Sequence, residues 1–214
     1  MRRLSAIGGT LAALMLARPS NADTGDFETH YEPDDSEKRS GLLVVLETGT
    51  AMGSISGYPN HYAKMDVDEY YVASPVGFGS NVGGWVGAIP RDWFSFGIGF
   101  TATSYTTNAG DAAGFMVGIR GEVYPLYSQG GFYKDWGLLV ESGAGRVTLE
   151  SEGETDPIVD GGSMSSVSTG TFFEAVEFWQ MNVGPQLRYT YQFGNPATAH
   201  TTTLSLRIGY HSGP

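Results

Sequence analysis

The sequence contains no cysteine, few charged residues and little basic charge. Without a thiol it has no disulfide framework, no cysteine nucleophile, no thiolate metal site and no lipid anchor attached to cysteine. Only 16% of the 214 residues are charged, and 12 Lys and Arg stand against 23 Asp and Glu, which gives a formal net charge of -11. Because a nucleic-acid-binding protein needs a basic surface, this class of function is excluded.

The sequence also has no apolar run long enough to cross a bilayer as a helix. Its mean hydropathy is -0.16, and the longest apolar run, Leu4 to Ala17, is too short to span. This run follows Arg2 and Arg3 and precedes Ser20-Asn21-Ala22, the order found in secretory signal peptides. We therefore predict a signal peptide over residues 1–22, although a buried N-terminal helix is an alternative. Cleavage would remove three arginines and no acids, so the net charge would become 9 − 23 = -14.

The segment that follows the signal peptide has little to bury. Residues 23–40 are polar and carry seven acids, among them Asp34 and Asp35. Such a composition is typical of a solvated chain. We predict a flexible acidic extension over residues 23–40 and a folded domain over residues 41–214.

What the folded domain has in abundance is glycine and aromatic residues in strict alternation. The sequence holds 31 Gly and 13% aromatics. In the segment from Phe94 to Ser104, five apolar residues alternate with small or polar ones. Successive side chains of a strand point to opposite faces, so this segment is predicted to be a strand with one apolar face. It follows another strand from Val76, and the predicted turn between them is Ile89-Pro90-Arg91-Asp92.

The same alternation predicts seven strands and no helix beyond the signal peptide. Long loops are predicted at Ser54–Tyr71 and Glu150–Thr171. Strands of this length and regularity, separated by turns, favour an antiparallel up-and-down β-barrel of about eight strands. The seven predicted strands cover residues 41–53, 76–88, 94–104, 115–124, 136–149, 179–193 and 202–210.

The second face of each strand indicates the orientation of the barrel. These faces carry mainly Gly, Ser, Thr, Asn and Gln, with about one charge per strand, whereas a face that meets water normally carries more charge. We predict that the apolar faces meet lipid and that the small, polar faces fill the lumen. The six charges would then form a paired lumen network, because a buried charge needs a partner. The alternative is a soluble sandwich with the same charges in solvent. The predicted network is Glu47, Arg120, Glu122, Glu141, Arg188 and Arg207.

Aromatic residues near the strand ends or along the apolar faces fit the two girdles of a transmembrane barrel. Ordinary core aromatics are the alternative. The predicted girdle residues are Trp85, Trp93, Tyr105, Tyr124, Tyr127, Trp136, Trp179, Tyr189, Tyr191, Phe193 and Tyr210.

The chain resembles the small outer-membrane β-barrel superfamily, which includes the transmembrane domain of outer membrane protein A and the opacity proteins. The residues that carry the resemblance are the signal peptide ending Ser20-Asn21-Ala22, the Gly-aromatic segments Gly77-Phe78-Gly79 and Phe96-Gly97-Ile98-Gly99-Phe100, and Trp179 to Phe193. The resemblance implies eight strands, periplasmic termini, short periplasmic turns, longer external loops and carboxylate–guanidinium pairs in the lumen.

The chain departs from that family in two respects. Only seven strands are readable where the family has an even number, so the eighth is either missing or hidden within Ser163 to Val176. The chain also ends Tyr210-His211-Ser212-Gly213-Pro214, where the family ends on a strand with a terminal aromatic that the barrel-assembly machinery reads.

The sequence gives little sign of catalysis, and we predict no catalytic, cofactor-binding or metal-binding residue. The four histidines lack metal-ligand spacing. There is no Gly-x-Ser-x-Gly elbow and no phosphate loop with its lysine. An acidic loop offers oxygen ligands for a divalent cation but lacks a calcium-loop pattern, so solvated surface is expected. The residues considered were His30, His61, His200 and His211, and the acidic loop Glu150, Glu152, Glu154, Asp156 and Asp160.

The sequence therefore favours a non-enzymatic β-barrel of the Gram-negative outer membrane, with a lumen plugged by side chains and a structural or surface role. Its two long loops would present the outer surface. Its expected partners are the lipid bilayer and the barrel-assembly machinery, with no nucleic acid and no identified protein partner. Two alternatives stay open: a narrow porin-like channel for small solutes, and a soluble secreted barrel that binds an apolar ligand as lipocalins do, with the Phe94 face inside.

Overall fold

The computed structural model describes residues 41–151, 153, 156–174, 176–178 and 180–212. The predicted signal peptide (1–22) and the predicted acidic extension (23–40) lie outside these residues. Among the described residues, no helix has the length and apolarity needed to cross a membrane.

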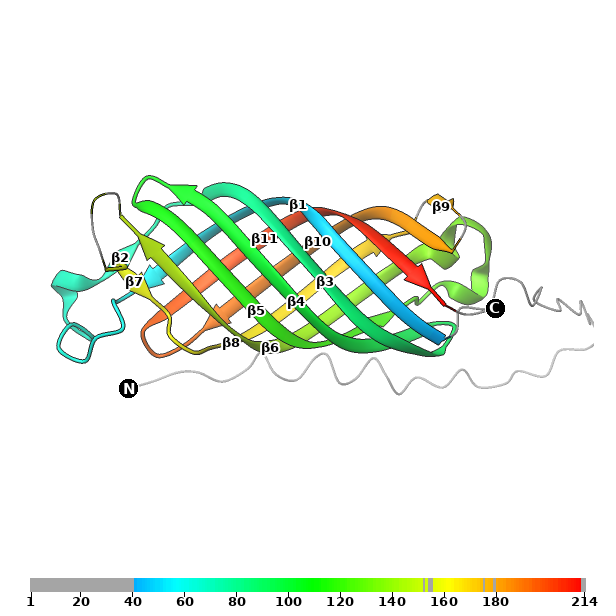
Figure 1. Ribbon diagram of the computed structural model, residues 1–214, viewed down its shortest axis with the longest axis horizontal. Helices are drawn as coiled ribbons and strands as arrows, with labels where there is room; N and C mark the ends of the chain where they lie inside the picture. Colours follow the sequence, from blue (N-terminus) through cyan, green and yellow to red (C-terminus); the bar gives the residue numbers. More distant parts are fainter. Residues whose placement is uncertain (1–40, 152, 154–155, 175, 179, 213–214) are drawn as a thin grey trace, which may run out of the picture. The chain divides into compact units, whose positions relative to one another are not determined.

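Eight long antiparallel strands form a closed β-barrel (Figure 1), which confirms the predicted fold class. Each strand pairs with the next along the chain, and the last pairs with the first from Leu43↔His211 to Gly57↔Ala197. Closure leaves no open sheet edge, so backbone N–H and C=O groups are paired within the wall. The strands are β1 (Gly41–Gly57), β3 (Gly77–Arg91), β4 (Phe94–Thr107), β5 (Gly110–Val123), β6 (Trp136–Glu150), β8 (Met164–Phe173), β10 (Met181–Phe193) and β11 (Ala197–His211).

Short strands and 3-10 helices lie at the two ends of the barrel. The loop end carries β2 (Val72–Ala73), β7 (Val159–Asp160) and the 3-10 helix η3 (Asp68–Tyr70). The terminus end, where β1 begins and β11 ends, carries the remaining short elements. Figure 1 shows β2 and β7 at one end and β9 at the other. The short elements of the terminus end are η4 (Tyr127–Gln129), η5 (Gly131–Asp135) and β9 (Val176–Phe178).

The strand that was not readable in the sequence is β8. It overlaps the second half of the region predicted as the loop Glu150–Thr171, so that prediction is wrong there, and the alternative of a strand hidden within Ser163–Val176 is correct. β8 pairs with β6 on one side and with β10 on the other. Its outward residues include Ser165 and Thr169 in place of bulky apolar ones, which removes the signal on which the other strands were recognised.

Several strands extend beyond their predicted ends. The β3–β4 turn is formed by Asp92 and Trp93, not by Ile89–Asp92, and Pro90 lies within β3 beside a register shift. Residues 105–107 and 110–114, which lie between two predicted strands, belong to β4 and β5, and residues 197–201 belong to β11, while the sixth predicted strand begins at Met181. The ladder of backbone hydrogen bonds therefore continues where the apolar alternation has already stopped.

The apolar faces of the strands point outward. Phe96, Ile98 and Phe100 on β4 and Leu187 on β10 are about half exposed, and Ile98 reaches 65%. Soluble monomeric proteins rarely expose a continuous apolar surface of this kind. The lipocalin-like alternative is therefore wrong, because it requires the face of Phe94 to Phe100 to line the interior.

Candidate functional site: the barrel interior

Five strands bring the six charged residues predicted from the sequence into the barrel interior. Because side chains alternate along each strand, all six point inward from β1, β5, β6, β10 and β11. None of the six is more than 2% exposed. The residues are Glu47, Arg120, Glu122, Glu141, Arg188 and Arg207.

Two arginines share two glutamates at the centre of this group. The Nη2 atom of Arg120 lies 2.7 Å from Oε1 of Glu47 and 3.0 Å from Oε2 of Glu141. Arg188 Nη1 lies 3.3 Å from the same Glu47 oxygen and 3.6 Å from the same Glu141 oxygen. The Gln186 amide also donates to Glu47. Each carboxylate is thus held by more than one strand across the lumen.

A second group of contacts is centred on Arg207. This guanidinium donates through Nη1 and Nη2 to the two oxygens of Glu122, at 2.5 and 2.8 Å, in the bidentate geometry that strengthens such pairs. It also lies over the Phe172 ring, 4.0 Å from the centroid. Arg120 Nη1 is 3.9 Å from Glu122 Oε1, so the two groups form one connected lumen charge network.

The structure adds a seventh residue to the network, Glu174, which sequence reasoning missed. It is 3% exposed and accepts from Arg207 Nε at 3.2 Å, from the Tyr124 hydroxyl at 3.3 Å and from the Asn182 amide at 3.4 Å. His211 Nε2 is 4.0 Å from it. Glu174 follows β8 in the connection to β9, outside any alternating segment, so no periodic signal marked it.

Glycines on neighbouring strands leave the room that these long side chains occupy. A Cβ atom at Gly99 would lie 2.9 Å from Cβ of Trp85 and 3.5 Å from Oε1 of Glu141. A Cβ atom at Gly83 would lie 3.3 Å from Cγ of Glu47. The small residues of the inward faces are therefore matched to the charged ones in volume.

Hydroxyl and amide side chains continue the interior toward the loop end. Along β11 the inward residues run from Arg207 through Ser205, Thr203 and Thr201 to Ala199. Asn81 donates to Ser205 at 3.1 Å. This polar belt separates the charge network from the apolar residues beyond it.

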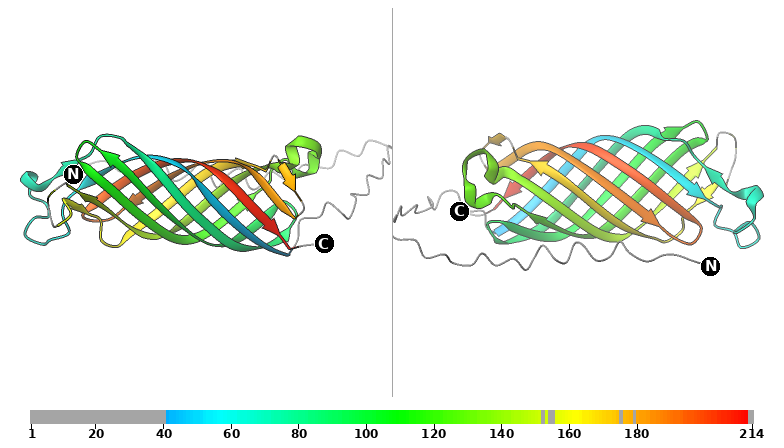
Figure 2. Two further views of the ribbon diagram at one scale, coloured as in Figure 1. Left: turned by 45° about the horizontal axis from the view of Figure 1, so that its top comes forward. Right: turned by 180° about the vertical axis from the view of Figure 1, so that it is seen from behind.

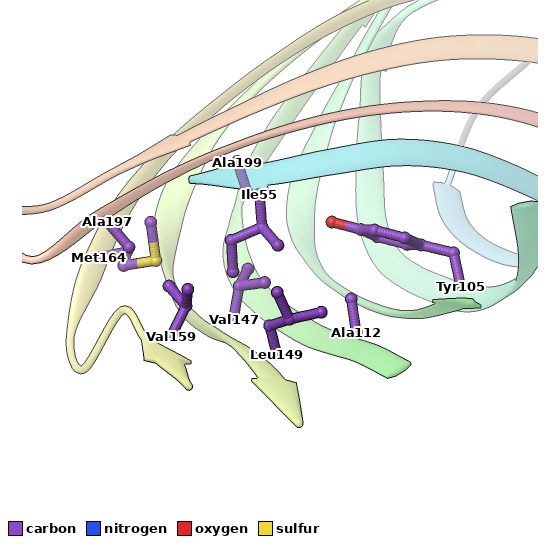
Figure 3. Close-up of a cluster of buried hydrophobic side chains, with 9 residues drawn as sticks. All are labelled: Ile55, Tyr105, Ala112, Val147, Leu149, Val159, Met164, Ala197 and Ala199. Atoms are coloured by element: carbon purple, nitrogen blue, oxygen red, sulfur yellow. The ribbon is translucent and has the colours of Figure 1, made fainter. Parts of the chain in front are cut away.

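At the loop end the interior is closed by apolar side chains (Figure 3), here called the apolar plug. The plug includes Val159 of β7, because the β6–β8 connection turns back and pairs with β6. The backbone N–H of Asp160 also donates to the carbonyl of Tyr58 at 3.2 Å, which ties this connection to the β1–β3 connection. The plug consists of Ile55, Tyr105, Ala112, Val147, Leu149, Val159, Met164, Ala197 and Ala199.

The residues of the predicted aromatic girdle fall into two groups, one buried inside the barrel and one exposed on its outside. Trp85, Tyr105 and Tyr124 are buried inside the barrel, so their assignment to a girdle is wrong. Their positions in the alternation place them on the inward faces of β3, β4 and the β5 end, and packing takes precedence there over proximity to a strand end. Trp179 lies outside the described residues. The exposed outward members are Trp93, Tyr189, Phe193 and Tyr210.

The residues considered for metal binding lie apart from one another. His61 stacks on Tyr62 at the loop end, and the Tyr189 hydroxyl is 2.7 Å from His200 Nδ1 on the outer wall. Of the acidic loop, Glu152 and Glu154 lie outside the described residues, and Asp160 is paired with Arg146 at 2.8 Å. In the part of the chain that the structure describes, no group of three metal-ligating residues occurs.

No protein-family model matches the chain, and no curated protein matches it. Solved structures to which it is similar include Ail, the attachment invasion locus protein of Yersinia pestis, with 13% identity over 78% of this chain and 98% of that chain and a TM-score of 0.46. Neisserial surface protein A is similar with 12% identity, 80% and 99% coverage and a TM-score of 0.45. The outer membrane protein OprG of Pseudomonas aeruginosa is similar with 12% identity, 82% and 99% coverage and a TM-score of 0.44.

The barrel's own geometry carries the assignment. Its wall is closed, its outer surface is apolar, and its interior is polar and charged, which together satisfy the requirements of a chain that crosses a bilayer with strands. The chain is a closed eight-stranded β-barrel with an apolar outer surface and a polar, charged interior, which is the arrangement of a barrel that crosses a membrane.

Proposed function

We propose that this protein is an outer-membrane barrel whose lumen is closed by its own side chains, and that it acts as a structural or surface protein without catalysis. The observation that carries the proposal is the presence of two blocks in series. The charge network fills the interior on the terminus side of the polar belt, and the apolar plug fills the loop end around Leu149.

The charge network resists the passage of solutes for an energetic reason. A solute would have to separate Arg120 from Glu47 and Glu141, and Arg207 from Glu122. Separating one partner of a buried pair leaves an uncompensated charge, at a cost of about 3–5 kcal/mol. The same contacts tie strands on opposite sides of the lumen together, so the network also stiffens the wall.

The outer wall and the loops supply the rest of the proposal. The apolar wall holds the barrel in lipid, and the β1–β3 and β6–β8 connections at the loop end would form the outer surface of the cell. Export would use the predicted signal peptide 1–22, and insertion would use the barrel-assembly machinery. The acidic residues 23–40 would then begin the mature chain on the periplasmic side.

Planar-bilayer recording of the refolded full-length protein tests the closed lumen. We expect no stepwise conductance from the wild-type protein. An opened control keeps the wall but replaces the blocks, with the six residues of the predicted charge network changed to Ser and with Tyr105 and Leu149 changed to Gly. This variant should conduct if it shows the heat-modifiable migration of a folded barrel. Discrete steps from the wild-type protein would instead support the narrow-channel alternative.

A further inference from the structure

The connections at the terminus end carry large apolar side chains that the barrel does not bury. Phe132 on η5 and Phe178 on β9 are each 68% exposed, and Tyr133 and Val176 are more than half exposed. Figures 1 and 2 show the η4–η5 segment and β9 next to each other at this end. We define the aromatic collar as Phe132, Tyr133, Phe173, Val176 and Phe178.

The collar faces the lipid side of the wall and not the lumen. Phe173 is the last outward residue of β8, and the Phe132 ring lies against it with 4.3 Å between centroids. β9 pairs with β10 so that Phe178 lies opposite Met181. Directly opposed residues of an antiparallel pair point to the same face, and Met181 belongs to the outward face of β10. The Phe178 side chain therefore points outward as well.

Two features of the backbone hold the collar beside the end of β8. Gly130 and Gly131, at the start of η5, have φ of 66° and 56°, a region that glycine adopts readily, and the backbone N–H of Glu174 donates to the Asp135 carbonyl at 3.0 Å. Two connections that are separate in sequence are thereby joined beside the end of β8. Neither belongs to the eight strands of the barrel, so the collar extends the apolar wall beyond the strand ends on the side of β6, β8 and β10.

We propose that the aromatic collar inserts into the boundary between headgroups and acyl chains of the leaflet at the terminus end, and so fixes the depth of the barrel on that side. The argument for lipid as the occupant is continuity, since the collar prolongs the same outward surface that meets lipid over the strands. Phe and Tyr side chains favour this boundary. The proposal rests on the transmembrane barrel but not on a closed lumen, so conductance of the wild-type protein would leave it standing.

The absence of cysteine makes a direct depth measurement possible. Single-cysteine variants Phe132→Cys and Phe178→Cys of the full chain would be refolded into phosphatidylcholine vesicles, labelled with a nitroxide and measured for accessibility to oxygen and to a water-soluble nickel complex. Ile98→Cys on the wall and Tyr62→Cys in the 86% exposed loop position set the lipid and water references. Glu177→Cys is the matched control, because it lies on the opposite face of β9 between two collar residues.

We expect the ratio of oxygen to nickel accessibility at Phe132 and Phe178 to fall between the two references, and nickel accessibility to be several-fold higher at Glu177 than at Phe178. Nickel accessibility at the collar equal to that at Tyr62 would overturn the proposal. Exclusion of both reagents would also overturn it, because it would mean that protein covers the collar. Only variants with heat-modifiable migration are scored, and Tyr133→Cys replaces either collar variant that does not fold.

Discussion

Glu47 is the residue on which the barrel interior depends most. Its carboxylate lies within 2.7 Å of Arg120 and 3.3 Å of Arg188, and it also accepts a hydrogen bond from Gln186. Two guanidinium groups that are fully removed from water would each lose a partner if this charge were absent. The alternation of β1 makes the inward position of Glu47 predictable, but which arginine it meets depends on strands far away in sequence.

The change Glu47→Gln should lower the free energy of unfolding by about 3–5 kcal/mol, because it removes the charge with almost no change in volume. Urea titration of the protein in lipid vesicles, followed by tryptophan fluorescence, measures this. Arg146→Ala is the control, since the Arg146–Asp160 pair is exposed at the arginine, with 50% side-chain exposure. It should change stability by less than about 1 kcal/mol. If both variants lower the free energy of unfolding equally, burial does not determine how much the charge network stabilises the barrel.

Two glycines on the neighbouring strands β4 and β5 should respond differently to the same substitution. A side chain at Gly99 would meet Trp85 and Glu141, whereas the nearest atom to a Cβ at Gly121 is a Phe94 ring carbon at 3.8 Å. Gly99→Val should destabilise the barrel by about 1–3 kcal/mol through overpacking. Gly121→Val faces outward and should stay within about 0.5 kcal/mol of the wild type. The same urea titration compares them, and a neutral Gly99→Val would contradict the volume match proposed for the lumen.

At the scale of the elements, the sequence predicts a strand wherever bulky and small residues alternate. β4 was predicted because Phe94, Phe96 and Phe100 alternate with small residues. β8 was not, because Ser165 and Thr169 face lipid with little bulk, and only its pairing with β6 and β10 makes it a strand. Strand ends were also misplaced, since the hydrogen-bond ladder continues through polar residues beyond the apolar wall.

Pro185 lies where the strand paired with one side of β10 changes from β9 to β8. β8 pairs with β10 from Gln186 onward and β9 pairs with it up to Val183, so Gly184 and Pro185 lie between the two partners. Proline has no N–H to donate, and at this position no partner strand requires one. The proline therefore sits where the ladder passes from one strand to another.

Moving the proline by two residues should prevent folding. The N–H of Leu187 points to the same side as the ring nitrogen of Pro185, and Thr171 of β8 lies opposite Leu187. Leu187→Pro removes a ladder bond inside the membrane, and we expect a loss of about 3 kcal/mol or more, with most of the protein lacking heat-modifiable migration. Pro185→Ala should migrate as the wild type does. Normal folding of Leu187→Pro would mean that the β8–β10 ladder is not required for closure.

At the scale of the whole molecule, the composition of the strand faces predicts which faces point outward. It predicts the residues of the interior only in part. Inward faces with Gly, Ser and Thr but few charges predict a lumen, and the alternation assigns to these faces six charged residues that are buried in the structure. Glu174 could not be found in this way because it lies in a connection, where no alternation assigns a face. Trp85 and Tyr105 had the inward position in the alternation, but their aromatic character suggested a girdle.

The position of the bilayer along the barrel can be tested by arginine substitution on the outer wall. Ile98 is the central one of the five apolar outward residues on β4, whereas Ser54 lies near the loop end of β1, opposite His200. An arginine costs about 2–4 kcal/mol on the lipid face at the midplane and about 0–1 kcal/mol near the interface. Ile98→Arg should therefore lose about 2–4 kcal/mol in vesicles, and Ser54→Arg less than about 1 kcal/mol. If the two losses are equal, the apolar wall is not centred in the membrane, and the assignment of the loop end to the interface would have to be given up.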